Sequence, residues 1–263
     1  MNKCILCKKS LDLIIDFGEQ SLANGLLDQT EQPSPRFPLS LTRCSSCGHI
    51  QLRERIAPEK MFSHYLWVTG TSKGAVDFSR DLCKRILNYQ PNVRSVLEIA
   101  SNDGTFLRPF YEANIEVLGI DPAENIAKLA NENGIKTLCE FFSYKKAEKL
   151  KYNLRKKYDV ILARNVIAHT PDPIDFLKGV QTLLSPTGHA YIEFHDAYNI
   201  LKSNQYDSIY HEHYSYFFLK SFTLAAKKAG LMVIDIIDSP ISGGALIAIL
   251  SKDLNNIVNK KCD

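Results

Sequence analysis

The sequence predicts an α/β protein in which a doubly wound, Rossmann-like sheet follows a small N-terminal module. From Lys73 onward, short apolar runs typical of buried strands alternate with amphipathic stretches typical of helices. Before residue 60, by contrast, the chain carries two CxxC pairs, a proline-rich stretch and no strong helical period. We therefore expect a small module over residues 1–60 and one large domain over residues 61–263.

Seven strands are expected in the large domain, each a run of aliphatic and aromatic residues between turn signals. They cover residues 95–100, 116–120, 136–138, 158–163, 190–194, 231–237 and 245–250. Helices are expected over 74–90, from Phe106, after Pro122, over 174–184 and over 221–229. Only the turn at 238–244 separates the last two strands, so they should be antiparallel neighbours. This feature favours the seven-stranded sheet of class I S-adenosylmethionine (SAM) methyltransferases over a dehydrogenase sheet.

The composition is that of an ordinary globular protein, with 45% hydrophobic and 23% charged residues. The net charge of +3 is too small to indicate binding to nucleic acid or to a membrane surface. No stretch approaches the roughly 18 consecutive apolar residues of a membrane span, and the N-terminus lacks the apolar core of a signal peptide. We therefore expect a cytoplasmic monomer or homodimer that acts on a small molecule.

Four of the seven cysteines form the two CxxC pairs, Cys4 with Cys7 and Cys44 with Cys47. An odd number of cysteines without an export signal argues against a disulfide framework. Four thiolates in tetrahedral array suit a structural zinc ion, which would supply folding energy that this short segment lacks. Four unpaired thiols and a rubredoxin-like iron site are the alternatives. His49 could replace one ligand, but a position at the surface is expected for it.

The loop after the first strand indicates a nucleoside cofactor without phosphates. It reads SNDGT at 101–105 and lacks the GxGxxG pattern that binds a pyrophosphate. Asp121, at the end of the second strand, is placed to accept hydrogen bonds from ribose hydroxyls, although it could instead cap the next helix. Together these signals predict SAM as the cofactor. The residues assigned to it here are Ala100, Ser101, Asn102, Asp103, Gly104, Asp121 and Pro122.

Further candidates follow the later strands, at the edge where ligands bind in open α/β sheets. Phe141 and Phe142 are placed to pack on adenine, or else in the core. Asn165 and His169 follow the fourth strand, and His169 is expected to face the cofactor or the acceptor, or simply to precede the next helix. Two residues at the end of the fifth strand are candidates for acceptor binding, Glu193 and His195.

Six segments give the chain a specific resemblance. They are LIIDFGEQSLANGLL at 13–27, FPLSLTRCSSCGHIQL at 37–52, YLWVTGTS at 65–72, EIASNDGTFL at 98–107, NVIAHTPDPIDF at 165–176 and YHEHYSYF at 210–217. With them the chain resembles the zinc-containing sugar C-methyltransferases that act on nucleotide-linked deoxyketosugars. That family usually carries a further C-terminal domain that contributes to nucleotide-sugar recognition, whereas this chain stops soon after its seventh expected strand.

The resemblance implies a SAM-dependent methyltransferase acting on a small activated carbohydrate. In the segment at 65–72 it implies cofactor contacts from Tyr65 and Thr71, and an acceptor contact from Trp67, where the family usually has tyrosine. Aromatic faces favour a sulfonium cation by the quadrupole effect that binds ammonium groups. Packing between domains is the alternative for Tyr65 and Trp67.

Residues 190–220 are expected to form an insertion that builds the acceptor site. It contains Tyr210, His211, Glu212 and His213, whose HExH spacing does not match the HExxH of zinc proteases. Methylating a carbon beside a ketone requires a base and a hydrogen-bond donor for the enolate, and histidine titrates near neutral pH. The resemblance implies that His213 is the base, with Tyr210, Glu212 and His211 beside it. A polar surface loop is the alternative.

Two other functions stay open on the sequence. The same histidine would serve methylation of a sugar hydroxyl or another surface-polysaccharide precursor, so the sequence does not separate carbon from oxygen as the acceptor atom. A zinc-ribbon binding protein with a non-catalytic Rossmann-like domain is the alternative from another class.

Overall fold

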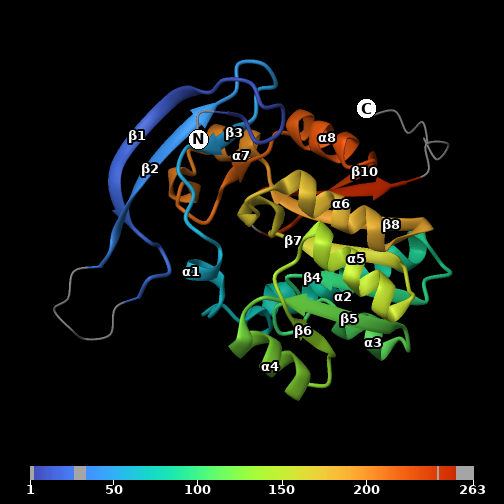
Figure 1. The fold of residues 1–263 in the computed structure, drawn as a ribbon. Coiled ribbons are helices and arrows are strands. Elements are labelled where there is room, and N and C mark those ends of the chain that lie inside the picture. The colour runs from blue at the N-terminus through green and yellow to red at the C-terminus, as the bar shows by residue number, and fades with distance from the viewer. Residues whose placement is uncertain (1–2, 27–33, 242, 253–263) are drawn as a thin grey trace.

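The computed structural model describes residues 3–26, 34–241 and 243–252, and it is built around two β-sheets (Figure 1). The larger sheet has seven strands in the order β10-β11-β8-β7-β4-β5-β6. The smaller sheet has four strands in the order β1-β2-β3-β9. The large sheet is the centre of the predicted α/β domain. The small sheet contains the N-terminal strands β1, β2 and β3 and lies beside that domain.

The strands of the large sheet confirm the predicted class. Their bounds are β4 (Ser95–Ile99), β5 (Glu116–Asp121), β6 (Thr137–Cys139), β7 (Tyr158–Arg164), β8 (Leu184–His195), β10 (Met232–Asp238) and β11 (Ala245–Ser251). The strands from β4 to β8 run parallel, whereas β11 is antiparallel to both of its neighbours, β8 and β10. The expectation of an antiparallel final pair is therefore confirmed.

Helices cover both faces of this sheet (Figure 1). Their bounds are α1 (Glu59–Phe62), α2 (Lys73–Tyr89), α3 (Arg108–Glu112), α4 (Glu124–Glu132), α5 (Tyr144–Leu154), α6 (Pro173–Leu183), α7 (Ala197–Lys202) and α8 (Leu219–Lys228), with short 3-10 helices at Thr69–Thr71, Ile167–His169 and Tyr206–Ser208. Leu97 and Ile99 of β4 pack with α6 and α8, whereas Val96 packs with α2 and α3. Alternate residues of a strand point to opposite faces, so the unbroken apolar strands are buried on both sides.

The fifth strand differs from its prediction at its beginning. The sequence predicts a helix over 174–184 and a strand over 190–194, but β8 begins at Leu184, directly after α6. Leu184 is fully buried and pairs with Tyr158, and the register shifts before His189 pairs with Val160. Because Leu184 is buried and paired, β8 begins there. Residues 185–188 (SPTG) then form an irregular first part of the strand.

The small sheet was not predicted as a sheet. It contains β1 (Asp12–Ser21), β2 (Arg36–Arg43), β3 (Ile50–Leu52) and β9 (Ser215–Tyr216), all in antiparallel pairs. The strand β9 comes from the expected acceptor insertion, nearly two hundred residues after β1. The apolar core of this sheet includes Leu41 and Leu52 and is covered by Ile200 of α7.

None of the helices in the described part of the chain is both long enough and apolar enough to cross a lipid bilayer.

Candidate active site

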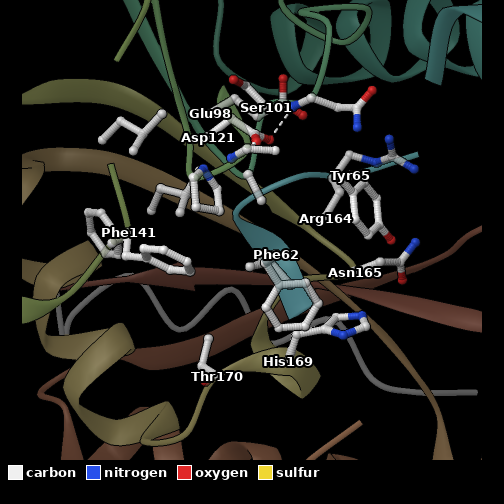
Figure 2. Close-up of a pocket in the computed structure, with 18 of the residues that line it drawn as sticks. Phe62, Tyr65, Glu98, Ser101, Asp121, Phe141, Arg164, Asn165, His169 and Thr170 are labelled. Atoms are coloured by element: carbon white, nitrogen blue, oxygen red, sulfur yellow. Dashed lines mark hydrogen bonds between the residues drawn. The ribbon is translucent and has the colours of Figure 1, made fainter. Parts of the chain in front are cut away.

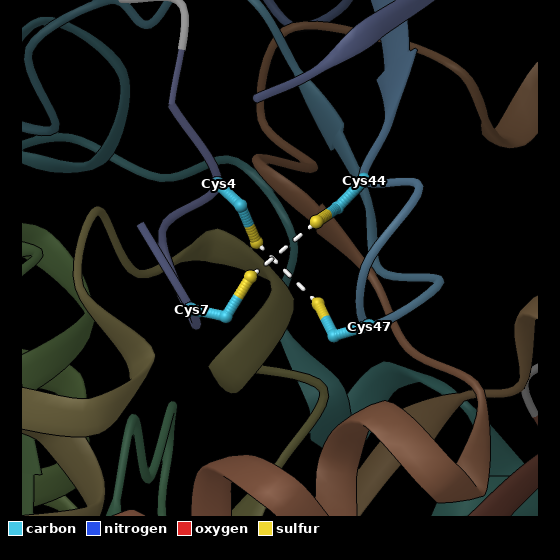
Figure 3. Close-up of side chains that lie close together, drawn as sticks. All are labelled: Cys4, Cys7, Cys44 and Cys47. Carbon is cyan, nitrogen blue, oxygen red and sulfur yellow. Dashed lines mark hydrogen bonds between the residues drawn. The ribbon is translucent and has the colours of Figure 1, made fainter. Parts of the chain in front are cut away.

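The four predicted cysteines converge in the small module (Figure 3). Their Sγ atoms all lie within 4.8 Å of one another, with Cys4 3.6 Å from Cys47 and Cys7 3.4 Å from Cys44. Tetrahedral zinc with Zn–S bonds of about 2.3 Å places its sulfurs at nearly this separation. Burial raises the pKa of the Cys4 and Cys47 thiols. Burial also acts on Cys7, but hydrogen bonds from the backbone of Lys9 and from the other cysteines outweigh it and lower the pKa of that thiol to about 7. Zinc binds thiolates, so a bound cation would offset the cost of ionising four thiols this close together, and the donor set fits zinc.

His49 does not lie at the surface, where it was expected. Its side chain is fully buried against the ring of Phe217, with ring centroids 5.0 Å apart. The residue stays beside the cysteines because the backbone N–H of Cys44 donates to its carbonyl oxygen. Its ring belongs to the packing between the module and the large sheet, not to the cysteine cluster.

A cavity of about 700 Å³ opens at the carboxyl ends of β4, β5 and β7 (Figure 2). This is the edge where ligands bind in open α/β sheets, and the volume suits a ligand the size of a nucleoside with an amino acid attached. In Figure 2 Glu98, Ser101 and Asp121 gather on one side, and His169 lies on the opposite side. The predicted residues that line the cavity are Tyr65, Trp67, Ala100, Ser101, Asn102, Asp121, Pro122, Phe141, Phe142, Asn165 and His169.

The loop after β4 is held in a shape that exposes its polar groups to the cavity. Ala100 and Asn102 adopt positive φ angles of 56° and 49°, and Gly104 one of 81°. The backbone N–H of Asn102 donates to Oδ2 of Asp121 at 2.9 Å. Ser101 is buried, and its hydroxyl has no hydrogen-bond partner among the described residues. A polar group left in this state beside a cavity is suited to a ligand.

Asp121 lines the cavity and does not cap the next helix. Its Oδ1 accepts a hydrogen bond at 2.9 Å from the N–H of Ala123, the N-cap residue of α4. The same carboxylate lines the cavity and supports the loop through Asn102. Burial raises the pKa of this carboxyl, and the two backbone N–H groups oppose that effect. Each oxygen retains a lone pair for a further donor, which suits the hydroxyls of a ribose.

Three residues predicted to bind the cofactor do not line the cavity: Asp103, Gly104 and Thr71. Oδ2 of Asp103 accepts from the N–H of Gly70 at 2.9 Å. A Cβ at Gly104 would lie 2.8 Å from the side chain of Ile135. These contacts hold the loop after β4 against Gly70 and Ile135. Asp103 and Gly104 therefore support the cavity wall without lining it.

The segment before α2 is tied to this loop. The side chain of Asn102 accepts from the N–H of Thr69 at 2.8 Å and donates to the carbonyl of Trp67 at 3.0 Å. Tyr65 and Asn125 exchange two hydrogen bonds between backbone and side chain. The aromatic residues of the YLWVTGTS segment therefore reach the cavity from its open side.

Sequence reasoning missed two charged residues on the cavity wall, Glu98 of β4 and Arg164 of β7. Burial raises the pKa of Glu98 to about 8. The guanidinium of Arg164 stacks 3.3 Å from the ring centroid of Phe106 and pairs with Glu193 at 2.6 Å. A signal was present in the sequence, because a charged residue inside an otherwise apolar buried strand requires a partner or a ligand.

Opposite the loop, two histidine rings pack against each other at a tilt, beside a tyrosine. The ring centroids of His169 and His213 are 4.8 Å apart, and Phe62 packs edge-on against His169. Nδ1 of His213 donates to the carbonyl of Ser208 at 2.8 Å, because a carbonyl can only accept. Its Nε2 therefore accepts, and the hydroxyl of Tyr210 lies 3.2 Å away as the donor. Burial lowers the pKa of His213 to about 4 and that of His169 to about 3.

His169 is the member of this group that lines the cavity, and His213 and Tyr210 lie behind it. Nδ1 of His169 is buried without a hydrogen-bond partner among the described residues. The other two residues of the predicted cluster are buried as well. Oε1 of Glu212 accepts from Asn24 at 2.6 Å, and Nε2 of His211 donates to the carbonyl of Phe37 at 3.2 Å. The segment is thus no exposed polar loop.

Of the three residues predicted to bind the acceptor, Trp67 lines the cavity, whereas Glu193 and His195 do not. Glu193 is fully buried, where it pairs with Arg164 and accepts from the hydroxyl of Ser239 at 2.7 Å. His195 contacts the carbonyl of Gly243 at 3.4 Å. Both residues hold the turn between β10 and β11, which brings Ile241 to the cavity wall.

Family models match most of the chain. The model described as "Methyltransferase domain" matches residues 75–236. The chain belongs to the methyltransferase family. A second model, described as "Putative zinc binding domain", matches residues 4–62. The predicted enzyme class is confirmed, and the boundary between residues 60 and 61 stays a prediction.

Relatives by sequence agree with this membership. C-methyltransferase NovU of Streptomyces niveus is 32% identical over 256 residues, which are 94% of this chain and 60% of NovU. A ubiquinone biosynthesis O-methyltransferase of Acinetobacter baylyi is 29% identical over 101 residues, which are 37% of this chain and 42% of that protein. The chain thus spans 60% of the length of NovU. The resemblance to zinc-containing C-methyltransferases is confirmed.

Solved structures share the fold at low sequence identity. The plantazolicin methyltransferase BamL, in complex with a triazolic desmethylPZN analog and SAH, superposes with a TM-score of 0.53 at 16% identity, over 68% of this chain and 85% of that chain. A SAM-dependent methyltransferase from Clostridium acetobutylicum gives a TM-score of 0.54 at 12% identity, over 67% of this chain and 91% of that chain. The class I methyltransferase fold is confirmed.

Proposed function

We propose that this chain transfers a methyl group from SAM to a carbon of a small activated carbohydrate, a nucleotide-linked ketosugar. The observation that carries the proposal is one cavity with two chemically different walls. One wall has the loop after β4 and Asp121, and the other has His169 with His213 behind it. The 32% identity to C-methyltransferase NovU supports carbon as the acceptor atom.

The first wall fits the cofactor. Asp121 is suited to bind the ribose, and Phe141 and Phe142 provide aromatic surface for the adenine. Arg164 offers a positive charge for the carboxylate of the methionine part. Burial keeps most of Glu98 protonated near neutral pH, and this carboxyl would ionise beside the ammonium group of a bound cofactor. When bound, SAM supplies an electrophilic methyl group on a sulfonium sulfur.

The second wall fits proton transfer. Carbon methylation beside a ketone requires that a proton leave the acceptor carbon and that the enolate oxygen receive a hydrogen bond. The hydrogen bond to Ser208 directs the lone pair of His213 Nε2 at the hydroxyl of Tyr210. In this proposal His213 is the base that takes the proton of Tyr210, as the Tyr210 oxygen takes the proton from the acceptor carbon. Tyr210 shares that nitrogen, so its hydroxyl is placed to exchange a proton with it. His169 forms the wall between this pair and the acceptor.

The test is incubation with methyl-¹³C SAM and a series of nucleotide-linked 4-keto deoxysugars, followed by NMR of the product. A methyl carbon bonded to carbon is expected, and His213→Asn is expected to lower turnover by about 10²-fold or more. A methoxy signal would replace the proposal by oxygen methylation, the chemistry named for the ubiquinone biosynthesis relative. Absence of any methylated sugar, with SAH still bound, would rule out a carbohydrate acceptor.

A further inference from the structure

The small sheet of the zinc module is completed by the segment that carries the proposed base. The strand β9 follows Tyr210 and His213 by a few residues and pairs with β3, Ile50 opposite Tyr216 and Gln51 opposite Ser215. The ladder extends one step further, because the N–H of Leu52 donates to the carbonyl of Tyr214 at 3.0 Å. The backbone position of the base segment is therefore set by β3.

Side chains add further ties between the module and this segment. The hydroxyl of Tyr214 donates to the carbonyl of Ile56. The ring of His211 donates to the carbonyl of Phe37 in β2, and Asn24 donates to Glu212. Every residue from 211 to 214 except His213 thus bonds to the N-terminal part of the chain, which leaves His213 itself directed at Tyr210 and Ser208.

One buried side chain links the cysteine cluster to this ladder. Gln51 is 1% exposed, and its Oε1 accepts a hydrogen bond at 2.8 Å from the N–H of Ile5, which lies between Cys4 and Cys7. The second cysteine pair lies in the turn that joins β2 to β3. Both CxxC turns are therefore attached to β3, one through the chain and one through Gln51.

The cofactor wall is supported from elsewhere. Its loop is held by Asp121, by the segment at 67–71 and by Ile135. Within the described ranges, no hydrogen bond joins residues 3–52 to the loops at 100–105 or 121–123. The two walls of the cavity therefore depend on different parts of the molecule.

We infer that the zinc module positions the acid/base segment of the acceptor wall, with Gln51 as the positioning residue that couples the cysteine cluster to β9. The inference rests on the proposed function for the meaning of that wall, but the coupling itself is a property of the fold. Loss of structure at the cysteine cluster should then loosen residues 208–217 and leave the cofactor wall unchanged.

The test compares Gln51→Met, which removes the acceptor at similar size, with Gln51→Glu, which retains an acceptor oxygen. Gln90→Met is the matched control, because Gln90 bonds to Asp159 of β7 and His189 of β8, away from β3 and β9. Amide hydrogen exchange of residues 208–217 is measured by mass spectrometry, and SAH affinity by calorimetry. Exchange should accelerate about tenfold or more in Gln51→Met only, with the SAH Kd changed less than about twofold.

Chelation of zinc from the wild-type protein should reproduce this pattern, and it carries the test if Gln51→Met does not fold. Unchanged exchange at 208–217 after both treatments would overturn the inference, as would a loss of SAH affinity in parallel with the faster exchange. Failure of the proposed function would give a different result. The wild-type protein would then not methylate a ketosugar, even if the rates of amide exchange at 208–217 changed as expected.

Discussion

At the scale of single residues, the environment of His213 sets the pH range in which it can serve as a base. Burial lowers its pKa to about 4, so the imidazole is neutral throughout the physiological range. We expect kcat/KM for methylation to stay constant from about pH 8 to pH 6, without the limb near 6.5 of an ordinary histidine. The measurement is a pH–rate profile on the acceptor identified by NMR. A limb at 6.5 would show that another group is the base.

Asp121 offers a second prediction at this scale, because it bonds to two backbone N–H groups and faces the cavity. Asp121→Ala should weaken SAH binding by about tenfold or more, since it removes a charged acceptor and frees the loop at Asn102. Asp121→Asn retains one acceptor oxygen and should lose less. Calorimetric titration with SAH measures both variants. Equal affinities for Asp121→Ala and wild type would mean that the carboxylate only supports the backbone at Asn102 and Ala123.

The residues that the sequence could predict are those whose chemistry is local. The cysteine pairs, Asp121 and the loop at 101–105 are recognisable because their spacing and their place after a strand already define a site. The prediction that His49 lies at the surface was wrong, because its ring is buried against Phe217, which lies far along the chain. Arg164 was missed because its pairing with Glu193 exists only after β7 and β8 align.

At the scale of elements, the loop after β4 requires glycine at position 104 for two reasons, its backbone conformation and its close packing. Gly104 has a positive φ, and a Cβ there would lie 2.8 Å from Ile135. Gly134 also has a positive φ, but a Cβ there would meet nothing within 4 Å. Gly134→Ala should therefore cost only the left-handed strain of about 1–2 kcal/mol. Gly104→Ala should cost more and should also weaken SAH binding, because the loop must move.

Urea unfolding and SAH titration of both glycine variants measure this difference. Equal losses of stability in the two variants, with SAH affinity unchanged, would contradict a role for close packing at Gly104.

The elements that the sequence predicted are those with a long apolar pattern, and those that it missed lack one. The strands β4 and β7 are buried on both faces along almost their whole length, so apolar residues dominate them. The hairpin of β1 and β2 is different, because Leu13, Ile14 and Ile15 are all exposed and alternation is absent. The strand β9 has two residues, and only its partner β3 makes it a strand.

At the scale of the whole molecule, titratable groups in and behind the cavity wall are buried with opposite consequences for stability. Burial lowers the pKa of His213 to about 4 and that of His169 to about 3. Between those values and about 6.5 the unfolded chain binds protons that the folded protein does not, so stability is lost as the pH falls through this range. Burial raises the pKa of Glu98 to about 8. Its contribution is full below about pH 4.5 and is lost as the pH rises towards 8.

The opposite pH dependences of these groups predict that the free energy of unfolding is greatest near pH 6 to 7. They also predict that one variant reduces the loss of stability at acid pH and another the loss at basic pH. His213→Asn should reduce the loss on the acid side by up to about 1.4 kcal/mol per pH unit, and Glu98→Gln should do the same on the basic side. The free energy of unfolding in urea at pH 5, 6.5 and 8 measures both effects. Each variant is the control for the other, because the two pKa shifts have opposite signs. A His213→Asn variant that flattened the basic side instead would mean that this histidine is charged in the folded protein, which would remove it as the base.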